Sequence, residues 1–274
     1  MRKFLLIALT ALLLASCVYQ SPFREEALFS SMGGDGDVVV TIDARRVKEG
    51  ALSSLLPQSV LIDRSDRISV SIGRSVYGAL EGNFGYAIVD AALAWSPDWK
   101  LMDEEDRYYR SRSSGLEAAV PVSGVLLFSS ESYRDAQSRL IDDRRAVISP
   151  VTSALMESSL AALYTRSAEA AVGMGIGITE DVADNIDEMV FLFDEKGDGL
   201  VLSGWIDMDS SSSARALVTV LRNELLKSIR ERGERPDFAA LSSYYTQDGD
   251  KVILAGIDID AESVRGILSR LEVF

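Results

Sequence analysis

Residues 188–209 read "EMVFLFDEKGDGLVLSGWIDMD" and set the fold class of the second half of the chain. Two apolar segments, "EMVFLFD" (188–194) and "GLVLSGWIDMD" (199–209), flank the short polar turn "EKGD". Apolar runs of this kind around a glycine-containing turn predict a β-hairpin. Serines follow the second run, and serine caps helices by accepting their free amide protons, so we expect a helix from about Ser213 to Arg232. The stretch therefore predicts an α+β unit.

The same pattern extends in both directions along the chain. Upstream, we expect strands at 37–43, 66–73, 76–85, 116–122 and 124–130, and helices at 44–56, 86–95, from about 130 to 140, and 150–172. Downstream, the dipeptide Asp248-Gly249 between apolar alternations predicts a second hairpin, which a closing helix at 261–271 follows. Helices and strands thus alternate over the whole body of the chain.

A weak internal repeat suggests how these elements are organised. Residues 122–141 align with residues 202–221, and serines and glycines recur at matching positions. The order of strand, helix, hairpin, helix and strand resembles the ferredoxin-like α+β sandwich. The resemblance implies two βαββαβ-type units with mainly antiparallel sheets, one at 37–121 and one at 122–274.

The N-terminal segment is typical of an export signal. Met1, Arg2 and Lys3 precede an apolar run from Phe4 to Ala15, and small residues then lead to Cys17. At ~1.5 Å per residue this run is too short to cross the ~30 Å hydrocarbon core of a bilayer, so it is not a permanent membrane helix. We therefore expect residues 1–16 to be a signal peptide.

Cys17 is the only cysteine in the chain, and its surroundings indicate what it does. The tetrapeptide Leu14-Ala15-Ser16-Cys17 resembles the lipobox of bacterial lipoproteins. The resemblance implies a diacylglycerol on the Cys17 thiol, cleavage before that residue, and several acyl chains holding the protein on a membrane. Residues 17–36 would then form the lipidated cysteine and a flexible tether, and Val18 resembles an outer-membrane sorting residue. The alternative is a signal peptide that happens to contain a cysteine.

Composition excludes several classes of function. Removing Arg2 and Lys3 with the signal takes the formal charge from −14 to −16, which disfavours nucleic acid and anionic lipid head groups as partners of the protein surface. The chain contains no histidine, so histidine-based nucleophilic sites and most catalytic zinc sites are excluded. We therefore expect no enzyme, and with Cys17 acylated no disulfide can form.

Three local motifs partly match known ligand-binding patterns but lack residues or surroundings that those patterns require. "DEKGDG" (194–199) has Lys196 where a calcium loop needs an oxygen ligand, so we interpret it as a hairpin turn. "GMGIGITED" (173–181) lacks the third glycine of a dinucleotide fingerprint. The acidic groups at 103–106 and 141–145 lie in polar stretches beside arginines, which favours solvated surface. We expect no metal site, catalytic residue or cofactor.

The segment at 95–115 concentrates aromatic residues and arginines. Such mixtures recur where proteins bind partners or ligands, so the candidate surface comprises Trp95, Trp99, Tyr108, Tyr109 and Arg110. The alternative is a connection whose aromatic rings cover the edge of the core.

These observations predict a lipid-anchored bacterial envelope protein, located at the outer membrane with a periplasmic or surface-facing body. Its body would be a non-enzymatic binding or structural module. It would contact the membrane through its lipid and have an envelope protein as a further partner. Two alternatives stay open: a carrier of an apolar ligand between envelope layers, and a histidine-free hydrolase that uses carboxylates or serine. A large apolar cavity would favour the carrier, and a deep pocket with paired carboxylates would favour the enzyme.

Overall fold

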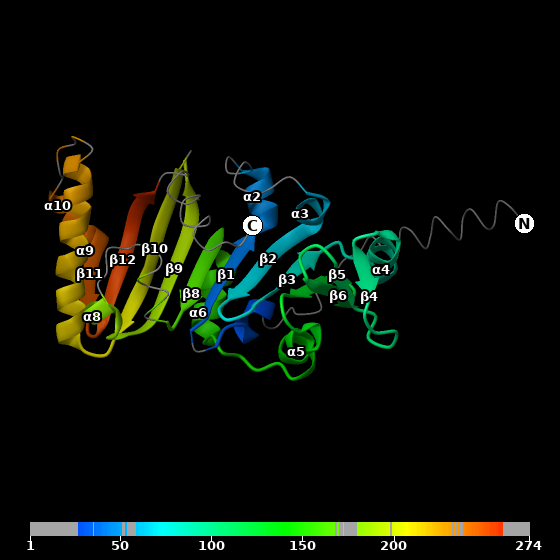
Figure 1. The fold of residues 1–274 in the computed structure, drawn as a ribbon. Coiled ribbons are helices and arrows are strands. Elements are labelled where there is room, and N and C mark those ends of the chain that lie inside the picture. The colour runs from blue at the N-terminus through cyan, green and yellow to red at the C-terminus, as the bar shows by residue number, and fades with distance from the viewer. Residues whose placement is uncertain are drawn as a thin grey trace, which may run out of the picture.

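Twelve strands form one antiparallel sheet in the computed structural model, which describes residues 27–259 except 35, 51–52, 54–58, 168, 170–171, 173–179, 198, 232, 234 and 236–237. Their order across the sheet is β11-β12-β10-β9-β8-β1-β2-β3-β7-β6-β5-β4 (Figure 1). The strands are β1 (Val38–Asp43), β2 (Ser65–Ile72), β3 (Val76–Gly82), β4 (Trp99–Leu101), β5 (Tyr109–Ser111), β6 (Glu117–Val122), β7 (Val125–Ser129), β8 (Ala161–Thr165), β9 (Ile186–Lys196), β10 (Gly199–Met208), β11 (Tyr245–Asp248) and β12 (Lys251–Ile259).

Helices cover both faces of this sheet. On one face lie α2 (Ala44–Glu49), α3 (Val60–Arg64), α4 (Tyr86–Trp95), α8 (Glu180–Ala183) and the long α9 (Ser211–Glu231), which all contribute to one apolar cluster. The other face is covered by the 3-10 helix η1 (Leu28–Ser31), α5 (Tyr133–Gln137), the π-helix η3 (Ser138–Asp142) and α6 (Pro150–Ser158). A further helix, α10 (Phe238–Tyr244), packs against α9, β11 and β12.

Strand alternation separates the two cores. In β3, Leu80 belongs to the cluster under α3 and α4, whereas Tyr77 and Ala79 belong to the cluster under α5 and α6. Successive side chains of a strand point to opposite faces, so one strand can supply both layers. The first cluster runs from Val89 on α4 to Leu217 on α9, and this continuity makes the described residues one folded body.

The hairpin at 188–209 is confirmed. β9 and β10 pair antiparallel, with Lys196 opposite Gly199 and Asp194 opposite Val201. Gly197 in the turn has a φ of +62°, a conformation that glycine adopts without steric cost. The expected helix after this hairpin is also present as α9.

The two ferredoxin-like sandwiches are not observed, and a single sheet replaces them. The proposed boundary at 121/122 falls within the β6–β7 hairpin, where Val122 pairs with Val125. Moreover β1, from the first proposed unit, pairs with β8 from the second, with Val40 opposite Leu163. Local patterns located most of the strands, though not β4, β5 or β8, and they did not specify this long-range pairing, which joins both halves into one sheet.

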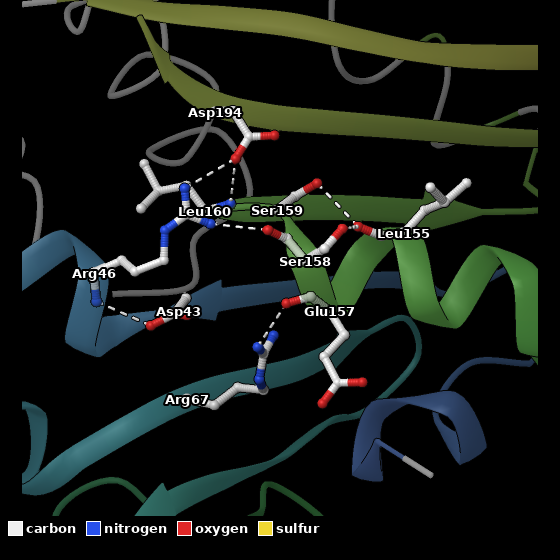
Figure 2. A network of polar contacts seen from close by, with 9 residues as sticks. All are labelled: Asp43, Arg46, Arg67, Leu155, Glu157, Ser158, Ser159, Leu160 and Asp194. Carbon is white, nitrogen blue, oxygen red and sulfur yellow. Dashed lines mark hydrogen bonds and ion pairs between the residues drawn. The ribbon is translucent and has the colours of Figure 1, made fainter. Parts of the chain in front are cut away.

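The helix expected at 150–172 ends early, because tertiary contacts override its alanine-rich continuation. α6 begins at Pro150 as expected but ends at Ser158, and residues 161–165 form β8 in the middle of the sheet. The hydroxyls of Ser158 and Ser159 donate to the carbonyl oxygen of Leu155 at 2.9 and 3.0 Å. Figure 2 shows these bonds at the end of the helix.

Two arginines and an aspartate hold this helix end in place. Arg46 on α2 donates to the carbonyl oxygen of Ser158 at 2.9 Å and to Asp194 Oδ1 at 3.2 Å, and the amide of Leu160 donates to the same oxygen at 3.1 Å (Figure 2). Arg67 donates to the carbonyl oxygen of Glu157 at 3.0 Å. Backbone groups that a longer helix would use internally are therefore bound by β2, β9 and α2 instead.

The expected tether to residue 36 is too long at its C-terminal end. Residues 27–33 are buried, and Leu28, Phe29 and Met32 have no solvent exposure. Ser30 accepts the amides of Val147 and Ile148 at 2.7 and 3.0 Å, which fixes η1 beside α6. The signal peptide at 1–16, Cys17 and the closing helix at 261–271 lie outside the described residues.

Candidate apolar ligand pocket

Four neighbouring strands provide the floor of an apolar pocket on the α3–α4 side of the sheet. Ile68 and Val70 on β2, Val76 and Leu80 on β3, Ala118 on β6, and Leu126 and Phe128 on β7 line it. On β2, β3 and β7 the lining residues are separated by two or four positions, so within each strand they share one face of the sheet. β6 contributes a single residue. The strand pattern therefore assembles a continuous apolar floor.

Gly78 on β3 leaves room for the ring of Phe128, the largest residue of the floor, which extends from β7 across β3. It pairs with Phe128, and a Cβ at this position would lie 2.6 Å from the Phe128 ring and 2.4 Å from the carbonyl oxygen of Ser69. Both separations are far below van der Waals contact, so the Phe128 ring occupies space that any other residue at position 78 would need.

Two short helices form the walls. Ser59 caps the N-terminus of α3, and its Oγ accepts the amide of Ile62 at 3.2 Å; α4 follows Gly85. The pocket is lined on these helices by Ser59, Val60, Leu61, Ile62, Arg64, Ile88, Val89, Ala92 and Leu93, and elsewhere by Phe84, Trp99 and Leu116. Among the described lining residues, only Ser59 and Arg64 have polar side chains; Trp99 adds an indole N–H group.

The pocket has a volume of about 460 Å³. Cavities that bind small organic ligands have volumes of ~300–1,000 Å³ and mostly apolar walls, so both size and lining fit this class. α4 explains how the space arises. Although nine of its ten residues, Tyr86–Trp95, are uncharged, only Val89 is fully buried. An apolar helix that buries so little of its surface leaves apolar area available to a ligand.

Exposed apolar side chains surround the pocket. Val60 and Leu61 on α3 are 70% and 47% exposed, and Ile88 on α4 is 50% exposed, yet all three also line the pocket. Trp95 at the end of α4 is 86% exposed. Clustered exposed apolar residues mark surfaces that meet another apolar surface or ligand.

A partly buried ion pair braces α4. Arg107, whose φ is +46°, donates to both carboxylate oxygens of Asp90 on α4 at 2.9 and 2.6 Å, and the hydroxyl of Tyr109 donates to Asp90 Oδ1 at 2.7 Å. The hydrogen bond from Arg107 lowers the pKa of Asp90, so this carboxylate stays charged at neutral pH. The brace joins the pocket wall to β5.

The structure distributes the five candidate residues of the 95–115 segment among different environments. Trp99 lines the pocket, and Trp95 is exposed at the end of α4, the helix that forms one wall. Tyr108 stacks on Tyr133 with ring centroids 5.2 Å apart. Tyr109 is buried in the Asp90 brace, and Arg110 pairs with the buried Glu117. The last three side chains therefore have contacts within the protein.

Sequence reasoning did not find the residues of the pocket on α3, β2 and β7. One signal was present in the sequence: "YAIVDAALAW" has apolar residues on all sides, whereas a helix on one side of a sheet needs them on one face only. The described residues contain no group of three or more potential metal-ligating side chains. No helix of the described chain has the length and apolar character needed to span a membrane.

Among solved structures, the fold is similar to that of TP0453, a lipoprotein of Treponema pallidum. Its crystal form I matches with a TM-score of 0.63 and 14% identity over 90% of this chain and 99% of that one. Crystal form III gives 0.60 and 15% over 88% and 97%, and crystal form IV gives 0.62 and 14% over 91% and 100%. The fold is thus shared over nearly the full length of both chains. No protein-family model matches the sequence, and no curated protein does.

Proposed function

We propose that the protein is a lipid-anchored envelope protein whose body binds and carries an apolar ligand in the pocket between α3 and α4. The observation that carries this proposal is the pocket itself, with its volume of about 460 Å³ and its apolar floor and walls. Burying apolar ligand surface there contributes ~25 cal/mol per Å² removed from water. A purely structural module has no use for such a space.

The anchor and the location rest on independent observations. Leu14-Ala15-Ser16-Cys17 supports acylation of Cys17, and the shared fold with a lipoprotein of Treponema pallidum supports the same class. We propose a location at the outer membrane, with the lipid as the membrane contact. A protein held at a membrane, with exposed apolar residues around an apolar pocket, is suited to exchanging ligands with that membrane or with an envelope protein.

Binding without catalysis is the form of the proposal that the site supports best. The alternative is a histidine-free hydrolase that uses carboxylates or serine. None of the described lining residues is a carboxylate, and none is a lysine that could activate Ser59, so this pocket provides neither arrangement. The walls offer an apolar surface, one serine hydroxyl and one guanidinium. These groups hold and orient a ligand.

A matched pair of substitutions on α4 tests ligand binding. Ala92 lines the pocket, whereas Ala94 is exposed on the same helix and does not line it. The mature chain, residues 17–274 with Cys17→Ser, would be titrated with N-phenyl-1-naphthylamine, whose fluorescence rises in apolar surroundings. We expect saturable binding that Ala92→Phe weakens at least about tenfold by filling the pocket, while Ala94→Phe leaves it unchanged. Equal binding by both variants, or none by the wild type, would refute the proposal.

A further inference from the structure

One charged residue lines the pocket. Arg64, the last residue of α3, is half-buried and is the one charged side chain among the described lining residues. A charge beside an apolar space is poorly solvated and gains much from a partner of opposite sign. The sign of this charge therefore bears on which ligand the pocket accepts.

The guanidinium of Arg64 has little else to bind. Its Nη1 lies 3.5 Å from the carbonyl oxygen of Asn83, which is long for a hydrogen bond, and a guanidinium has five N–H donors. No carboxylate of the described residues lies within ion-pair distance of it. Asp63 and Asp66 are near in sequence, but both are exposed and neither lines the pocket.

The hydroxyl of Ser59 lies on the same wall. Its oxygen accepts the amide of Ile62 at 3.2 Å, so its hydrogen remains able to donate to a ligand. Ser59 and Arg64 both come from α3, whereas α4 and the strands contribute apolar side chains to the lining. The pocket thus has one donor-bearing wall facing apolar surfaces, which matches a molecule with a polar head and an apolar chain.

We propose that the pocket selects single-chain amphiphiles with an anionic head group, a carboxylate or a phosphate, which pairs with Arg64 while the chain lies on the floor of β2, β3 and β7. The proposal rests on the proposed function, because it assigns the ligand class of the same pocket. Guanidinium groups bind carboxylate and phosphate through paired, charge-assisted hydrogen bonds. A neutral head gains less from Arg64, and a cationic head is repelled.

Competition for bound N-phenyl-1-naphthylamine tests the head group separately from the chain. Oleate, oleoyl lysophosphatidate and oleyl alcohol carry comparable 18-carbon chains, so their displacement constants are compared at about pH 8, where carboxylate heads are ionised. In the wild-type mature chain we expect at least one anionic ligand to bind about tenfold tighter than oleyl alcohol. Arg64→Gln should bring that ratio close to one, because the neutral amide no longer distinguishes an anionic head from an alcohol. Arg45→Gln, at an exposed position on α2, should retain the wild-type ratio.

The outcomes separate this proposal from the function on which it rests. If oleyl alcohol and the anionic ligands bind equally, or if Arg64→Gln keeps the anionic preference, the role of Arg64 is refuted and the apolar pocket stands. If none of the probes binds, both proposals fail. A wild-type denaturant-unfolding profile for Arg64→Gln would show that this variant is folded, so a lost preference would then report on the head group.

Discussion

At the scale of the residue, Glu81 is a buried carboxyl group whose charge bears on stability. It lies on β3 with its side chain 7% exposed, and its Oε2 has no hydrogen-bond partner among the described residues. Burial raises its pKa to about 7, against an opposing effect of Arg67. Its neighbour Leu80 faces the pocket, so Glu81 faces the opposite core.

Replacing Glu81 by glutamine should remove a pH dependence of stability. Because the folded-state pKa of about 7 exceeds the ordinary 4.5, the folded protein holds the proton more tightly, and its stability falls as pH rises from about 4.5 to 7. Above pH 7 the deficit is constant. We therefore expect Glu81→Gln to be more stable than the wild type at pH 8, by at most ~3 kcal/mol, and about equal to it at pH 4. Denaturant unfolding across this range measures the difference.

Glu131→Gln is the matched control, because Glu131 is exposed. It should follow the wild-type profile at every pH. Parallel profiles of Glu81→Gln and the wild type would contradict the assignment of this pH dependence to Glu81.

At the scale of the element, the end of α6 shows where tertiary contacts decide secondary structure. Asp194 Oδ1 accepts both from Arg46 and from the amide of Leu160, so it links α2, β9 and the start of β8. Asp194→Ala should cost about 1–2 kcal/mol of unfolding free energy, because it removes two charge-assisted bonds at a partly exposed site. Asp258→Ala removes one exposed ion pair with Lys196 and should cost less than ~1 kcal/mol. Equal costs measured by denaturant unfolding would contradict a special role for Asp194.

The same element shows what the sequence could and could not predict. Apolar runs bounded by turn residues predicted β1, β2, β3, β9 and β10. "AALYT" at 161–165 is short and follows a good helix former, so its helix propensity concealed a central strand. Of the pocket, the sequence singled out Trp99 but not α3 or Phe128, because a cavity depends on how distant elements pack together.

At the scale of the whole molecule, pairing across the chain replaces the two units that the internal repeat suggested. β1 lies between β2 and β8, and the apolar cluster below it reaches from α4 to α9. Strands are recognisable from their local sequence, whereas the pairing of two strands more than a hundred residues apart, such as β1 and β8, has no local sequence signal. The fold class could therefore be predicted, and the single sheet could not.

The proposed anchor predicts the fate of the whole protein in a bacterial envelope. Cys17→Ser should abolish incorporation of labelled fatty acid, because a serine hydroxyl cannot form the thioether. It should leave an uncleaved precursor or a soluble product. Deleting residues 18–26 should keep the label, because the lipid is attached upstream and the described core begins at Ala27. Metabolic labelling followed by membrane fractionation measures both variants, and labelled Cys17→Ser protein would contradict the anchor.

The central claim is that an apolar ligand occupies the space between α3, α4 and the floor of the sheet, and photo-crosslinking tests it most directly. A fatty acid with a diazirine in its chain would be bound to the mature chain and irradiated, and the modified peptides mapped by mass spectrometry. We predict modification of residues that line the pocket, such as Ile88, Leu93, Trp99 and Phe128, and its loss in Ala92→Phe. Modification confined to other exposed apolar residues, such as Val151 on α6 or Phe238 on α10, would contradict the claim.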